Sequence, residues 1–124
     1  MTTWACLVAG GVAGTLARYA LAGAVYRMFG TNFPYGTLAV NVSGCGLVGF
    51  FAALAEAKFL LGPNARLLLM VGFCGAFTTF STFMLETSNL LKDGETLRAF
   101  LNMAASVLCG FAALKVGAYL AELL

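Results

Sequence analysis

Gly72-Phe73-Cys74-Gly75-Ala76-Phe77-Thr78-Thr79-Phe80-Ser81-Thr82-Phe83 is the most informative stretch of this chain. Its twelve positions hold four phenylalanines, two glycines and four hydroxyl residues, within an otherwise apolar region. A helix that only fills lipid is mostly Leu, Ile, Val and Ala. Polar groups at membrane depth are costly unless something uses them. The stretch therefore indicates a functional segment inside a membrane, which the rest of the chain holds in place.

The composition is that of a membrane protein. Of 124 residues, 61% are hydrophobic and only 10% are charged, with a mean hydropathy of +0.93. A soluble domain has about a quarter of its residues charged. The net charge of +2 is too small to indicate a nucleic-acid partner. Histidine is absent, which removes the commonest general base, so we expect no enzyme.

Four long runs nearly free of charge predict four transmembrane helices, because a bilayer core needs about 20 apolar residues per helix. The runs are separated by turn signals at Gly30–Pro34, Gly62–Asn64 and Lys92–Glu95. The apolar N-terminus lacks a positive flank and is expected to be the first spanning helix. We predict a multi-pass, all-α integral membrane protein with one domain, 1–124. Its approximate helices are 3–29, 36–61, 66–91 and 96–123.

Several residues within these helices have two interpretations. Gly10 and Gly14 have the spacing that lets two helix backbones approach closely. Arg18 either extends to the headgroups or faces a watery vestibule and attracts anions. Asn41 either bonds a neighbouring helix or donates its N–H groups to a passing ion. On the last helix, Ser106 belongs to a small and polar stripe that either packs or lines a wet path.

The charge distribution does not favour one membrane orientation. With four helices, both termini and the 56–66 loop share one side, and the 27–34 and 86–98 loops share the other. The lysines and arginines number three on the first side and four on the second. The positive-inside rule needs a clear asymmetry. We therefore infer that the chain inserts both ways round and forms an antiparallel two-fold homodimer.

The central stretch contains a predicted helix break near Gly75–Thr78. Glycine beside the pair Thr78 and Thr79 is a poor helix-forming combination, since Thr hydroxyls compete for backbone bonds. A break frees carbonyl oxygens, which need a partner inside a membrane, and a cation is a suitable one. Two carbonyls per subunit at a dimer axis would form a four-oxygen site. Without nearby acids, this site suits a monovalent ion.

Phe80 and Phe83 are three residues apart and so share one helix face, with Ser81 and Thr82 between them. An aromatic ring is negative on its face and positive at its edge. Rings presented edge-on therefore stabilise an anion without a fixed charge. The alternative is that Phe80 and Phe83 only pack against neighbouring side chains. The surrounding hydroxyl residues disfavour this alternative.

Three motifs resemble the small Fluc-type fluoride channels, the CrcB-like proteins. They are Gly72–Phe83, the Gly10–Gly14 segment followed by Arg18-Tyr19, and Pro34–Gly44 (PYGTLAVNVSG). Their order, the chain length and the helix count also agree with that family. The resemblance covers essentially the whole chain and is highly specific.

The resemblance implies a dual-topology antiparallel homodimer in the cell inner (plasma) membrane, with two pathways that passively export toxic cytoplasmic fluoride and so confer fluoride resistance. It implies a structural sodium ion at the dimer interface, held by main-chain oxygens of Gly75 and Thr78, and a vestibule arginine, Arg18. The expected partners are fluoride, a second copy and the lipid bilayer. The expected fluoride pathway is lined by Asn41, Thr79, Phe80, Ser81, Thr82, Phe83 and Ser106.

Two other functions fit the sequence less well than a channel does. A small proton-coupled drug exporter needs a membrane-embedded carboxylate, and no acid precedes Glu56 or lies near a predicted helix centre. A membrane scaffold subunit explains the Gly10 and Gly14 packing face but leaves the run of hydroxyl residues and phenylalanines unexplained.

Overall fold

The computed structural model describes residues 2–124, which form four helical spans long and apolar enough to cross a membrane. The first is α1 (Thr2–Phe29), the second α2 (Tyr35–Glu56) and the last α6 (Thr96–Glu122). The third span consists of four helical pieces: α3 (Pro63–Arg66), η1 (Leu67–Cys74), α4 (Gly75–Phe77) and α5 (Phe80–Lys92). The chain is thus an all-α, multi-pass membrane protein, as predicted.

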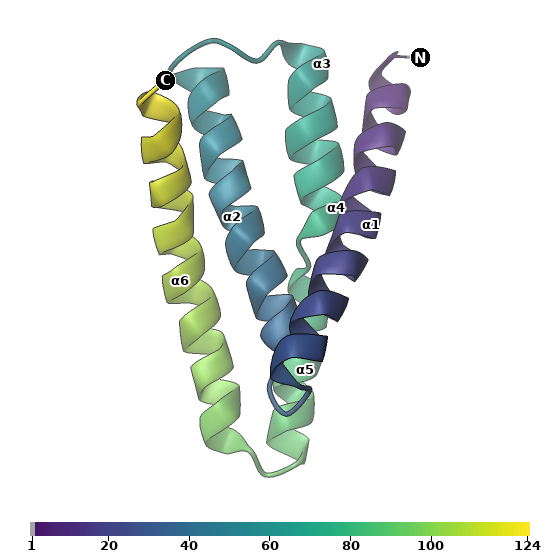
Figure 1. Cartoon of the computed structure of the whole chain (residues 1–124), viewed down its shortest axis with the longest axis vertical. Coiled ribbons are helices and arrows are strands. Elements are labelled where there is room, and N and C mark those ends of the chain that lie inside the picture. The colour runs from purple at the N-terminus through teal and green to yellow at the C-terminus, as the bar shows by residue number, and fades with distance from the viewer. Residues whose placement is uncertain (1) are drawn as a thin grey trace.

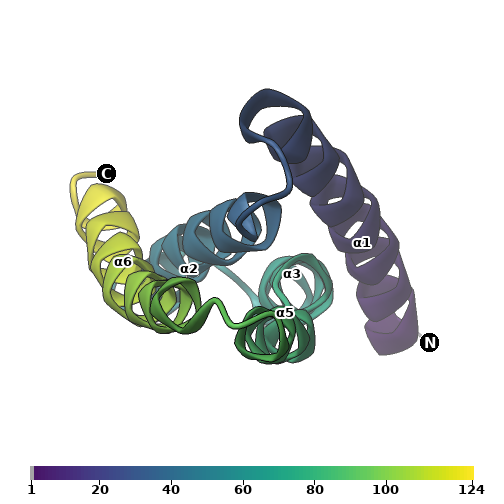
Figure 2. The same cartoon turned by 90° about the horizontal axis from the view of Figure 1, so that it is seen from below.

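Consecutive spans run antiparallel (Figure 1). Both termini and the α2–α3 connection lie at one end of the bundle, and the α1–α2 and α5–α6 connections lie at the other. Seen along the bundle, α2 lies between α6 and the third span, and α1 lies beyond them (Figure 2). Short connections between apolar helices favour this arrangement.

Close backbone contact between α1 and η1 confirms the packing role predicted for Gly10 and Gly14. A Cβ atom on Gly10 would collide with the carbonyl oxygen of Leu68, and one on Gly14 with that of Phe73. On the η1 side, a Cβ on Gly72 would lie 3.1 Å from the Cα of Gly10. η1 is a π-helix, a form that sequence reasoning did not predict.

The second close pair is α2 with α6. A Cβ on Gly49 would collide with the carbonyl oxygen of Leu114, and one on Gly117 with that of Gly46. The polar stripe of the last span is therefore a packing face along this part of α6. Nearer the other end of α6, Asn102 is 1% exposed and its Nδ2 donates to Thr87 Oγ1 at 3.0 Å.

The helix of the third span is interrupted at Thr78 and Thr79, slightly later than sequence reasoning placed the break. Gly75 itself is helical (φ −61°, ψ −38°). Thr78 (φ −86°, ψ 157°) and Thr79 (φ −149°, ψ 113°) are extended. Extended geometry suits β-branched residues, so the two threonines, rather than the glycine, form the break.

The second helix ends at Glu56, not at residue 61 as predicted. Beyond it, Phe59 has a positive φ of 53°, and the Leu60 N–H donates to the Leu54 carbonyl at 2.8 Å. Arg66 also bonds to the end of α2, where its Nη2 donates to the Ala55 carbonyl at 2.9 Å. Residues 56–61 contain no Gly, Pro or Asn to signal this turn in the sequence, and the contacts satisfy carbonyl groups at the end of α2.

We expect Gly14→Ala to lower the thermal unfolding temperature of the purified protein in detergent. The added methyl group meets the Phe73 backbone, which cannot rotate away, and overpacking of this kind costs about 1–3 kcal/mol. Gly11→Ala is the matched control, because nothing lies within 4 Å of its added Cβ. Equal unfolding temperatures for the two variants would contradict the close α1–η1 contact.

Candidate functional site

The side chain of Asn41 pairs with the broken backbone at Thr79. Asn41 Nδ2 donates to the Thr79 carbonyl at 2.9 Å, and the Thr79 N–H donates to Asn41 Oδ1 at 2.7 Å. Of the two interpretations of Asn41, the structure therefore shows the bond between helices. The amide carries two N–H donors, so one remains beyond the bond to Thr79.

The side chain of Thr79 begins α5. The Thr82 N–H donates to Thr79 Oγ1 at 3.2 Å, and the Thr79 hydroxyl donates to Thr82 Oγ1 at 3.0 Å. This is an N-cap, in which a side-chain oxygen satisfies an otherwise unpaired helix N–H. Asn41 and the cap together hold the first turn of α5, on which both candidate phenylalanines lie.

The first cavity, the aromatic cavity, has a volume of about 340 Å³ and lies between α2, α5 and α6. The rings of Phe80 and Phe83 meet edge to face, with centroids 5.9 Å apart and planes at 72°. Phe83 is 7% exposed, whereas Phe80 is 72% exposed. Ser106 Oγ is buried here without a hydrogen-bond partner among the described residues. The cavity thus brings together Asn41, Thr79, Phe80, Phe83 and Ser106.

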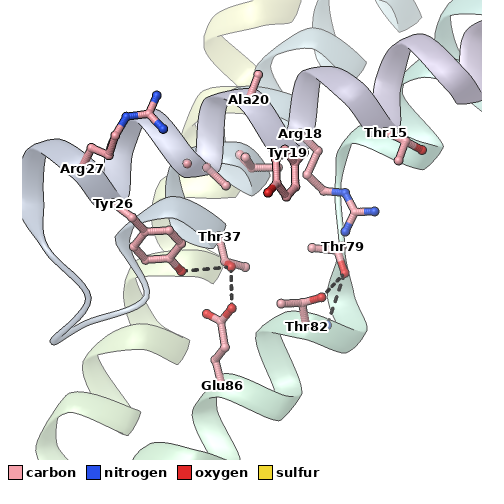
Figure 3. Close-up of a pocket in the computed structure, with 13 residues that line it drawn as sticks. Thr15, Arg18, Tyr19, Ala20, Tyr26, Arg27, Thr37, Thr79, Thr82 and Glu86 are labelled. Carbon is pink, nitrogen blue, oxygen red and sulfur yellow. Dashed lines mark hydrogen bonds between the residues drawn. The ribbon is translucent and has the colours of Figure 1, made fainter.

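The second cavity, the arginine cavity, has a volume of about 540 Å³ and is lined by Arg18, Thr79 and Thr82, among others. In Figure 3 the guanidinium of Arg18 extends from α1 toward Thr79. The Nε of Arg18 is buried with no hydrogen-bond partner within residues 2–124. Thr79 lines both cavities, so the positive side chain and the phenylalanine pair lie on opposite sides of the break.

A cluster of Tyr26, Thr37 and Glu86 also lines the arginine cavity, and sequence reasoning did not assign it (Figure 3). Thr37 Oγ1 donates to Glu86 Oε1 at 2.7 Å, and the Tyr26 hydroxyl lies 3.5 Å from Thr37 Oγ1. Glu86 follows Thr82 by four residues, so the two share one helix face. This spacing is the feature of the sequence that could have placed Glu86 beside the predicted site.

Glu86 is the carboxylate that lines the arginine cavity among the described residues. Glu86 lies within the third span, half-buried, and its Oε2 has no hydrogen-bond partner in the described chain. This residue is nearer the Lys92 end of that span than its middle, so the argument that no acid lies near a helix centre, and with it the case against a proton-coupled exporter, is unchanged.

Of the other predicted site residues, two lie apart from this group and one belongs to it. Ser81 is exposed and lines neither cavity. Gly75 is also exposed, and a Cβ added to it would lie 4.0 Å from the Met70 carbonyl oxygen. Thr78 lines the aromatic cavity, and its hydroxyl donates to the Cys74 carbonyl at 2.9 Å.

Comparison with known proteins places the chain among channel sequences. The family model described as "CrcB-like protein, Camphor Resistance (CrcB)" matches residues 5–118. The chain is 54% identical over 115 residues to the fluoride-specific ion channel FluC of Chlorobaculum tepidum, covering 93% of this chain and 90% of that protein. It is 45% identical over 118 residues to the FluC of Maridesulfovibrio salexigens, covering 95% and 94%. With the FluC of Geobacter sulfurreducens it shares 51% identity over 107 residues, covering 86% of each.

We expect Asn41→Leu to destabilise the protein, because it leaves the N–H and the carbonyl of Thr79 unpaired. Each unsatisfied group costs about 1–3 kcal/mol. Thermal unfolding in detergent measures the loss. Ser43→Ala is the matched control on the same helix, since among the described residues the Ser43 hydroxyl bonds only to its own helix, at Ala39 and Val40. If Asn41→Leu unfolds at the same temperature as Ser43→Ala, the pairing does not support the break.

Proposed function

The chain belongs to the CrcB-like protein family, and on that basis we propose that it is a fluoride-selective channel through which fluoride leaves the cytoplasm passively. It is not an enzyme. The observation that carries the proposal is the aromatic cavity, where Asn41, Phe80, Phe83 and Ser106 meet at membrane depth. The four apolar spans support a membrane location, and the proposal places the protein in the cell inner (plasma) membrane.

The proposed pathway begins in the arginine cavity. Arg18 supplies a positive charge whose Nε has no protein partner in the described chain, so it attracts an anion without first breaking an ion pair. The hydroxyls of Thr79 and Thr82 come next, and Thr79 leads into the aromatic cavity. Fluoride is strongly hydrated, so each of these groups must substitute for a lost water molecule.

Within the aromatic cavity, the second N–H of Asn41 and the unpartnered hydroxyl of Ser106 are the remaining donors. The edges of Phe80 and Phe83 carry partial positive charge and add weak attraction without a fixed cation. Weak, successive contacts let the ion leave as well as enter. We propose that larger halides are disfavoured because of their size.

Thr37 is excluded from the proposed set of ion donors, although it lines the arginine cavity. Its hydroxyl hydrogen is directed to Glu86 at 2.7 Å and so is not available to an anion. The Glu86 carboxylate repels an anion at that end of the cavity. The path should therefore run along the Arg18 side, away from Glu86.

We propose that the working unit is an antiparallel homodimer with two such pathways. Phe80 is 72% exposed although it lines the cavity, so a second copy would complete the wall on that side. The α1 face is also exposed, with Trp4 at 70%, Val8 at 63% and Leu16 at 65%. These apolar faces need either lipid or a partner, and the balanced charge permits an inverted one.

A structural sodium ion held by the carbonyls of Gly75 and Thr78 is part of the proposal. In a continuous helix these carbonyls accept from the N–H groups of Thr79 and Thr82. Here the Thr79 N–H donates to Asn41 and the Thr82 N–H donates to the Thr79 side chain. The two oxygens therefore lose their usual donors. Because Gly75 is exposed, two inverted copies can bring four such oxygens together.

Purified protein in liposomes should release trapped fluoride much faster than chloride, measured with ion-selective electrodes. Phe80→Leu and Phe83→Leu should each lower fluoride efflux about tenfold, the equivalent of one lost aromatic contact of about 1.4 kcal/mol. The control is Phe100→Leu, a ring that is 61% exposed on α6 and lines neither cavity.

Equal chloride and fluoride flux would exclude the channel proposal. Unchanged fluoride flux in both phenylalanine variants would assign these rings to packing alone. A scaffold subunit predicts no flux of either ion, and a proton-coupled exporter predicts flux that requires a proton gradient.

Dual topology predicts that a membrane-impermeant thiol reagent labels each terminus in about half of the molecules. The reagent would be applied to sealed vesicles holding Thr3→Cys or Leu123→Cys, with the four native cysteines replaced by alanine. The reason is the near balance of lysine and arginine between the two sides. Complete protection of one terminus would show a single orientation.

Protein extracted and reconstituted throughout without sodium, using a large organic cation instead, should lose dimer stability and fluoride flux. The four proposed carbonyl oxygens would then face one another without a positive charge. Adding sodium back should restore both, measured by size-exclusion chromatography and by efflux. Identical behaviour in the two salts would remove sodium from the proposal and leave the channel proposal intact.

A further inference from the structure

A third hollow, which we call the α6 groove, lies outside both cavities. It has a volume of about 640 Å³ and lies between one face of α6 and the α1–α2 connection. Its α6 wall runs from Arg98 through Ala104 and Ala105 to Cys109. The α6 residues of the aromatic cavity are Ser106, Val107 and Leu114, so the two hollows share no α6 residue.

The length of the groove matches one leaflet of a bilayer. Arg98 and Cys109 are eleven residues apart, which is about 16 Å along a helix, and half of a bilayer core is about 15 Å. Arg98 lies in the first turn of α6, and Cys109 lies near its middle. The groove therefore extends from the membrane surface to about the bilayer centre.

The outer end of the groove carries a positive and a negative group side by side. Arg98 Nε lies 3.5 Å from Glu95 Oε2, and both side chains are 46% exposed. Arg98 Nη1 also donates to the Asn32 carbonyl at 3.1 Å, which ties it to the α1–α2 connection. A guanidinium has five N–H donors, so these two contacts leave three. A carboxylate likewise keeps acceptor positions open.

Aromatic rings form the opposite wall at the same level. The Tyr35 ring lies 5.8 Å from that of Phe29 and 5.1 Å from that of Phe33, centroid to centroid. Such rings gather where headgroups meet hydrocarbon. Deeper in, the small side chains of Ala104 and Ala105 leave room for an acyl chain.

We propose that the α6 groove binds one phospholipid whose headgroup is zwitterionic with a primary ammonium, as in phosphatidylethanolamine. The phosphate lies on the free N–H groups of Arg98, the ammonium on the Glu95 carboxylate, and one acyl chain along Ala104 and Ala105. Arg98 and Glu95 together have no net charge, so the pair complements a zwitterion better than an anionic lipid. The site is separate from the ion pathway.

Native mass spectrometry of the full-length protein in detergent tests this, with phosphatidylethanolamine, phosphatidylcholine and phosphatidylglycerol added at equal concentrations. We expect one phosphatidylethanolamine per chain, retained in preference to the other two. Arg98→Gln should weaken its retention about tenfold, because a hydrogen bond to a charged group is worth about 1.5 kcal/mol or more. Glu95→Gln should abolish the preference over phosphatidylglycerol. Lys92→Gln, an exposed cation at the same end of the bundle, should change nothing.

Ala105→Trp fills the groove and should prevent retention, whereas Ala112→Trp, on an exposed part of the same helix outside the groove, should not. The size-exclusion profile of each variant checks that it is folded. Equal retention of all three lipids, or equal loss in Ala105→Trp and Ala112→Trp, would overturn the proposal. So would a change of oligomeric state in Ala105→Trp without loss of lipid, which would assign the groove to a second copy.

Discussion

The pairing of the Asn41 amide with the backbone of Thr79 is the interaction on which the rest of the site depends. A helix that breaks inside a membrane leaves an N–H and a carbonyl unpaired, and lipid offers no replacement. Asn41 supplies one acceptor and one donor at the two needed positions, 2.7 and 2.9 Å away. With the break stabilised, α5 begins at Phe80, capped by Thr79, and its phenylalanines are directed into a cavity.

Close helix packing makes this pairing possible. A Cβ on Gly44 would collide with the methyl group of Thr78, so a larger residue there would push the break away from α2. Gly10 and Gly14 similarly bring η1 against α1. In a membrane, helices gain little from burying apolar surface against one another, and close contact between small residues supplies the attraction. The glycines therefore determine how close the helices lie, and so how close the polar groups of the site are to one another.

The groups that line the two cavities differ in the strength of the positive charge they offer to an anion. Arg18 contributes a full positive charge, the hydroxyls of Thr79 and Ser106 contribute dipoles, and the rings of Phe80 and Phe83 contribute only partial charges at their edges. Glu86 lies in the same cavity as Arg18, but its contact with Thr37 draws it toward α2. In the proposed pathway, an anion would therefore meet decreasing attraction from Arg18 to the phenylalanines, a gradient that suits passage better than tight binding.

Hydrophobic run lengths were enough to predict four antiparallel spans, and glycine spacing was enough to predict the α1 packing face, because both signals are local. Polar and aromatic side chains in apolar helices indicated Asn41, Phe80, Phe83 and Ser106, and the order of the motifs led to the family. Only the tertiary structure decided that Asn41 bonds Thr79, 38 residues away, and that Thr37 bonds Glu86, 49 residues away. The tertiary structure also showed that α2 ends at Glu56 and that the break in the third span lies at Thr78 and Thr79. Partners so distant in the chain meet only when the helices pack, and helix packing in a membrane depends on contacts that no local pattern encodes.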